Sequence, residues 1–67
     1  MFGIEWLRGG IPIDKEASVL TNEAEAIASA QIRAPLVAKR HSEREPDSFR
    51  LTDATGQILG IFPIRIR

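Results

Sequence analysis

One segment, residues 22–40, constrains the fold of this 67-residue chain more than any other feature, because it has the pattern of a single long helix. Asn22 can cap its start, and Glu25 follows at the three-residue spacing of a capping box. Lys39 and Arg40 lie in the last turn, where basic side chains suit the helix dipole. The stripe expected at helical spacing consists of Ala24, Ile27, Ala28, Gln31, Ala34 and Ala38. Since this stripe is mostly alanine, the large core side chains must come from a second layer.

Pro35 leaves two alternatives for this segment. Proline has no amide hydrogen to donate, and it disfavours helical geometry in the residue before it. The helix therefore either kinks at Pro35 or ends near Arg33. Residues 36–40 contain no turn signal, which favours one kinked helix.

Three other segments have the alternating pattern of β-strands. Residues 2–8 and 48–52 each place apolar side chains on one face, and residues 57–67 form the most apolar segment of the chain. A short extra edge strand is possible at residues 11–13 after the Gly-Gly turn, where Pro12 would confine it to an edge. Residues 14–18 are polar and predict a loop.

The predicted fold class is α+β, with the order β-α-β-β in one domain over residues 1–67. A three-stranded, mainly antiparallel sheet has one helix packed on one face. Residues 53–56 predict a hairpin turn, with Gly56 in the left-handed backbone conformation. The apolar last strand is expected in the middle of the sheet, although Pro63 would interrupt its pairing on one side.

This sheet is predicted to carry more apolar surface than one helix can cover. Burying one Leu or Ile side chain contributes about 1.5–3 kcal/mol, and a domain this small buries only about 60% of its unfolded surface. We therefore expect a two-fold symmetric homodimer through the uncovered sheet face or an edge strand. Its predicted interface residues are Leu7, Leu59, Ile61 and Pro63. The alternative is that these are scattered surface residues of a monomer.

The charges balance over the whole chain but not along it. Residues 1–32 carry two basic and five acidic side chains, a net charge of −3, and residues 33–67 carry seven basic and four acidic, a net charge of +3. This opposed arrangement could assist head-to-tail or antiparallel contact. The best candidates for binding phosphate are Arg33, Lys39, Arg40 and Arg44, which make weak nucleic-acid binding the alternative function. Acidic residues interrupt this cluster, so we favour a solvated helix end.

No residue pattern indicates catalysis, a cofactor or a metal site. His41, the single histidine, is interpreted as a solvated loop side chain and not as a catalytic base. The chain has no cysteine, and it lacks the histidine clusters and calcium-loop spacing of metal sites. The longest uncharged apolar run, residues 58–64, is far too short to span a membrane, and no signal peptide is visible. The expected location is the cytoplasm.

Several segments together resemble a known pattern: residues 2–4, Asp14 with Leu20, residues 22–26, and residues 49–59. The chain resembles a group of short, alphaproteobacterial-type proteins that share a domain of unknown function. The resemblance implies a bacterial protein that opens with an aromatic-rich strand and closes with a hairpin, and it carries over no catalytic residue. The predicted function is a small cytoplasmic, non-catalytic interaction module that self-associates as a dimer. An unknown protein partner is a possible addition to this role.

Overall fold

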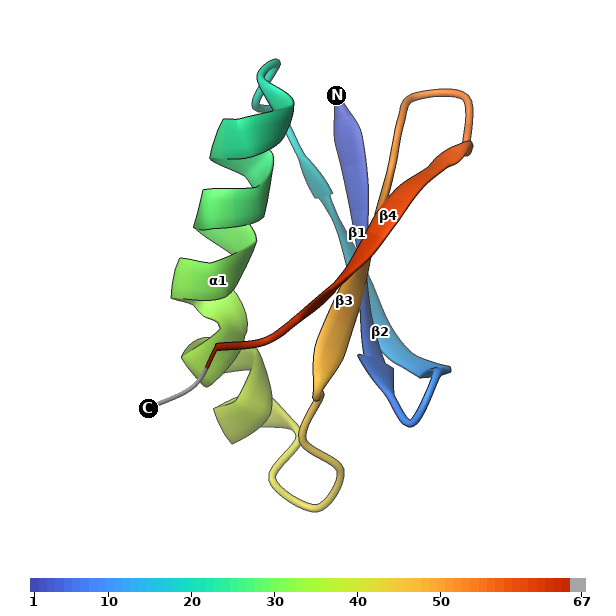
Figure 1. Ribbon diagram of the computed structural model, residues 1–67. Coiled ribbons are helices and arrows are strands. Elements are labelled where there is room, and N and C mark those ends of the chain that lie inside the picture. Colours follow the sequence, from blue (N-terminus) through green and yellow to red (C-terminus); the bar gives the residue numbers. More distant parts are fainter. Residues whose placement is uncertain (66–67) are drawn as a thin grey trace.

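The computed structural model describes residues 1–65 as four strands and one helix. The elements follow in the order β1 (Phe2–Arg8), β2 (Ile11–Ser18), α1 (Glu23–Arg40), β3 (Ser48–Thr52) and β4 (Ile58–Pro63). All pairings in the sheet are antiparallel, its strand order is β2-β1-β3-β4, and α1 lies against one face (Figure 1). The α+β class and the single helix on one face are confirmed.

The predicted count of three strands is wrong, because the arm after the first turn is a full strand. Gly9 and Gly10 have φ angles of 59° and 83°, and this left-handed turn sends β2 back along β1. The segment predicted as a loop pairs throughout, with Asp14 opposite Trp6 and Ser18 opposite Phe2. An edge strand can be this polar, because it does not have to bury both of its faces.

The predicted central position of the last strand is also wrong. β4 lies at one edge of the sheet, and β1 and β3 are the central strands. Pro63 fits this position, since an edge strand can lack an amide donor on its open side. β4 ends at Pro63, and the part of the predicted strand formed by Ile66 and Arg67 lies outside the described residues.

The helix begins as predicted and continues through the proline. The Asn22 Oδ1 atom accepts a hydrogen bond from the Glu25 amide at 3.1 Å. α1 extends past Pro35 to Arg40, so the alternative in which the helix ends near Arg33 is wrong.

The predicted helix stripe is partly wrong, since Ala24 and Ala28 are exposed. Alanines lie on several sides of this helix, so their spacing alone does not select the buried side. The residues that it buries are Ala26, Ala30, Ala34, Val37 and Ala38.

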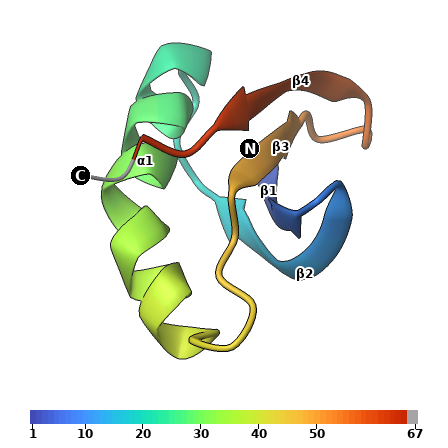
Figure 2. The ribbon, with the colours of Figure 1, turned by 60° about the horizontal axis from the view of Figure 1, so that its bottom comes forward.

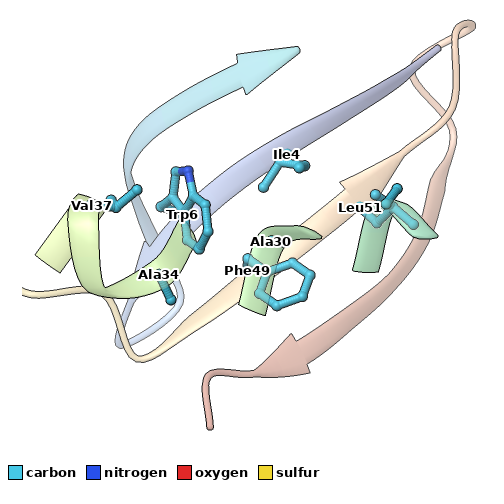
Figure 3. Packing of buried hydrophobic residues seen from close by; sticks show 8 residues of the cluster. Ile4, Trp6, Ala30, Ala34, Val37, Phe49 and Leu51 are labelled. Atoms are coloured by element: carbon cyan, nitrogen blue, oxygen red, sulfur yellow. The ribbon is translucent and has the colours of Figure 1, made fainter. Parts of the chain in front are cut away.

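The core is built from large side chains of the sheet and small ones of the helix. Trp6 and Phe49 are fully buried, with ring centroids 5.6 Å apart, and Phe62 continues the row at 5.5 Å from Phe49. Figure 3 shows the sheet side chains pointing toward Ala30 and Ala34 of the helix. The alanines allow a close approach of the two layers, while the aromatic row supplies the largest side chains of the core.

Candidate functional site

Most of the predicted interface residues lie on β4, and we call residues 58–61 of this strand the open edge. Ile58, Leu59 and Ile61 are 54%, 37% and 58% exposed, and Pro63 is also exposed. β4 has β3 on one side and no further strand on the other side within residues 1–65 (Figure 2). The apolar side chains of the open edge are therefore uncovered in a single copy of the chain.

Leu7, the remaining predicted interface residue, does not belong to this exposed surface, because it is buried within the single chain. It is only 2% exposed because β1 is a central strand and the connection after α1 folds back over its end. The Asp47 amide donates to the Leu7 carbonyl at 2.8 Å, and Arg8 donates to the Glu45 carbonyl at 2.9 Å. Pro46 in the same connection is buried.

The sheet face opposite the helix is not a continuous apolar surface. The strand registers place Lys15, Glu5, Arg50 and Ile61 in one row across this face. Arg50 and Glu5 form an ion pair in the middle of the row, and both side chains are about one quarter exposed. Apolar side chains on this face are concentrated at its β4 end, so the edge is a better candidate than the face for an interface.

The two edges of the sheet differ in chemistry. β2 contains Pro12, a bulge at Ile13 and three consecutive charged residues, Asp14, Lys15 and Glu16. These features block the pairing of an edge with another strand. In contrast, residues 57–64 contain no charged side chain. The open edge of β4 is thus the less protected of the two.

On the helix-facing side of β2, Glu16 joins the sheet to the helix. The indole Nε1 of the buried Trp6 donates to Glu16 Oε2 at 2.8 Å. Arg33 of α1 donates from Nη2 to Glu16 Oε1 at 2.6 Å. This carboxylate satisfies a buried donor that would otherwise lack a partner, and it neutralises the arginine.

Asp14 makes a second connection two residues away on the same strand face. Its Oδ2 atom lies 2.9 Å from His41 Nε2 and 3.3 Å from Arg40 Nη1. The hydrogen bond with His41 is the main cause that lowers the pKa of Asp14 below its ordinary value, and Arg40 adds to the effect.

His41 is therefore not the solvated loop residue that the sequence predicts. Its backbone caps the end of α1, and its ring is held by Asp14, 27 residues away in sequence. A catalytic role would need a reacting group beside the ring. Within residues 1–65, no serine or threonine hydroxyl hydrogen-bonds to the ring of His41.

The predicted nucleic-acid-binding residues are not gathered into one available patch. Arg33 and Arg40 are engaged by Glu16 and Asp14 of the same chain. Lys39 and Arg44 are exposed and form no ion pair within residues 1–65. Nucleic-acid binding stays a prediction with less support, because half of the proposed cations are already neutralised.

Two spacings in the sequence could have revealed these connections. Asp14 and Glu16 are two residues apart, which places both on one face of a strand. Arg33 and Arg40 are seven residues apart, which places both on one side of a helix. Because residues 14–18 are predicted as a loop, the sequence prediction does not pair the two carboxylates with the two arginines.

A pocket of about 300 Å³ lies beside the Glu16–Arg33 pair, and Ile4, Ser18, Leu20 and Ser29 help to line it. This volume is at the lower limit for small-molecule sites, and its charged groups already satisfy each other. No cluster of three metal-ligating side chains occurs within residues 1–65. In the same part of the chain, no helix has the length and apolar character needed to cross a membrane.

The chain has no significant match to a protein-family model, a curated protein or a solved structure. The resemblance to the alphaproteobacterial-type group therefore stays a prediction.

Proposed function

We propose that this protein is a small, non-catalytic interaction module of the cytoplasm that pairs with a second copy of itself along the open edge of β4. The observation that carries the proposal is an edge strand with exposed apolar side chains and no charge in residues 57–64. Such an edge is a template for pairing with another chain.

Apolar burial would supply most of the free energy of association. Ile58 and Ile61 are each more than half exposed, and fully burying such a side chain contributes about 1.5–3 kcal/mol. Backbone hydrogen bonds, each with a net contribution of about 0.5–1.5 kcal/mol, would fix the orientation of the two strands.

A second copy is the partner that fits this edge. Two β4 strands that meet around a two-fold axis bring no like charges together, because residues 57–64 are uncharged. The connections at Glu5, Asp14 and Glu16 also support the edge over a charge-driven contact, since these carboxylates already pair with arginines of their own chain.

The test is the mass of the protein in solution, measured by sedimentation equilibrium over micromolar to submillimolar concentrations. We expect wild-type protein to approach twice its chain mass of 7.4 kDa as concentration rises. Ile61→Lys should remain a monomer, because it places a charge on each copy at the centre of the contact. Ile32→Lys is the matched control, since Ile32 is 76% exposed on the helix and should leave the dimer intact.

Wild-type protein that stays at the chain mass over this whole range would contradict the proposal. Equal association of wild type and Ile61→Lys would place the contact elsewhere on the molecule. Far-ultraviolet circular dichroism of each variant checks that the fold is retained.

A further inference from the structure

The side chain of Gln31 binds the backbone of the chain where β4 ends. Its Nε2 donates to the Pro63 carbonyl at 2.9 Å, and its Oε1 accepts from the Arg65 amide at 2.9 Å. Both backbone groups point away from β3, on the side where a further strand would pair. The Gln31 carboxamide therefore occupies one position of the neighbouring strand that the sheet lacks within residues 1–65.

The alternation of backbone directions identifies which groups of β4 remain open. The Ile64 amide donates to the Asp47 carbonyl at 3.1 Å, so Ile64 faces β3. Every second residue of an antiparallel strand faces the same neighbour, so Phe62 also faces β3 and Ile61 faces outward. Toward the start of β4 the regular pattern stops at a bulge, where the register shifts between Gly60 and Ile58.

Ile61 is thus the one regular position of the open edge with both backbone groups directed outward. Pro63 has no amide hydrogen, and Gln31 already binds its carbonyl. In an antiparallel pair, two residues directly opposite each other can exchange both N–H···O bonds. Ile61 is therefore the one residue of the open edge on which the two-fold axis of a pair of identical strands can lie.

We propose that Gln31 is a specificity-determining residue that caps the β4 edge and confines a second copy to a single register, in which Ile61 of one copy lies opposite Ile61 of the other. This inference rests on the proposed self-association. It adds the register in which the two strands pair and the residue at which the pairing ends. Without the cap, the outward-facing carbonyl of Pro63 becomes available to a backbone amide of the second copy. Both ends of the contact would gain a hydrogen bond.

The register is tested by disulfide cross-linking. The chain contains no cysteine, so each single variant has one thiol. Residues directly opposite in a hydrogen-bonded antiparallel pair have Cα atoms about 5.5 Å apart, within the usual disulfide range. We expect Ile61→Cys to form a covalent dimer under mild oxidation. Ile58→Cys, at a position 54% exposed on the same strand, should cross-link much less because it lies away from the axis.

The cap is tested with Gln31→Met, which keeps side-chain length and removes both hydrogen bonds. We expect the Arg65 amide to exchange its hydrogen faster, and the dimer dissociation constant to fall about tenfold, which corresponds to about 1.4 kcal/mol. Gln57→Met is the control, since Gln57 is the other glutamine and is exposed immediately before β4.

The outcomes separate this inference from the proposed function. A wild-type dimer with equal cross-linking at positions 58 and 61, or with a dissociation constant unchanged or raised by Gln31→Met, would overturn the inference and leave self-association standing. A monomeric wild type with an associating Gln31→Met would overturn the proposed function and support the cap. If both proteins are monomers, both proposals fail.

Discussion

Single polar side chains connect segments of this protein that are far apart in sequence. Glu16 binds both Trp6 of the sheet and Arg33 of the helix, and Asp14 binds both Arg40 and His41. Each carboxylate therefore fixes the helix relative to β2 with charge-assisted hydrogen bonds. Their partners could not be predicted from local sequence, because the spacing of Asp14 and Glu16 is informative only once β2 is recognised as a strand.

Asp14 makes the stability of the protein sensitive to acid. Its pKa is lowered from 3.8 in the folded state, chiefly by the hydrogen bond with His41, so below pH 3.8 the folded state binds fewer protons than the unfolded state. The stabilisation is complete above pH 3.8 and is lost as pH falls through the lower folded pKa. We expect Asp14→Asn to reduce the free energy of unfolding at neutral pH and to flatten its acid dependence.

Denaturant unfolding at a series of pH values measures this effect. Glu43→Gln is the control, because Glu43 is exposed and makes no hydrogen bond within residues 1–65, and it should leave the pH dependence unchanged. Hydrogen bonds also lower the pKa values of Asp47 and Asp53. The free energy of unfolding should therefore keep part of its acid dependence in every variant. An unaltered slope in Asp14→Asn would show that the His41 contact does not stabilise the fold.

At the scale of elements, α1 and the β3–β4 hairpin were predictable because their signals are local. The Asn22 cap and the Gly56 turn each depend on a few adjacent residues, and both are confirmed. The possible edge strand at residues 11–13 is the start of β2, but its continuation over residues 14–18 was missed, because the side chains from Asp14 to Glu16 are all polar and alternate between helix contacts and solvent. A period-two pattern of apolar residues does not appear in such a strand.

The hairpin turn depends on the backbone freedom of Gly56, whose φ angle is 89°. A side chain at this angle is strained, so we expect Gly56→Ala to lower the free energy of unfolding by about 1–2 kcal/mol. Gly56→Asn should lose less, since asparagine tolerates this conformation better. Chemical denaturation of the two variants at neutral pH gives the comparison, and equal stability of wild type and Gly56→Ala would contradict it.

At the scale of the whole molecule, the opposite charges of the two halves of the sequence meet inside one copy of the chain. Three carboxylates from residues 1–32, namely Glu5, Asp14 and Glu16, pair with arginines from residues 33–67. The strand order could not be predicted, because it depends on these long-range pairings and on Gln31 binding the end of β4. The apolar content of the last strand suggested a central position, whereas β4 lies at an edge, where Ile58, Leu59 and Ile61 stay exposed and Phe62 packs against the core.

Self-association through an uncharged edge should be insensitive to salt. We expect the dissociation constant of the dimer to stay constant or fall between about 0.05 M and 1 M sodium chloride, where charge contacts are screened. Sedimentation at several salt concentrations measures it. A dimer that dissociates as salt rises would indicate that the opposed charges of the two chain halves drive the contact instead of β4.

The burial of Trp6 gives the protein a built-in optical probe. Trp6 is the only tryptophan, the chain has no tyrosine, and the indole is fully enclosed beside Phe49 with its nitrogen bound to Glu16. Fluorescence excited near the red edge of indole absorption therefore arises from one chromophore between the two layers. The emission maximum of Trp6 will shift when water enters between the helix and the sheet. One spectrum of each variant therefore reports whether its helix still packs against its sheet.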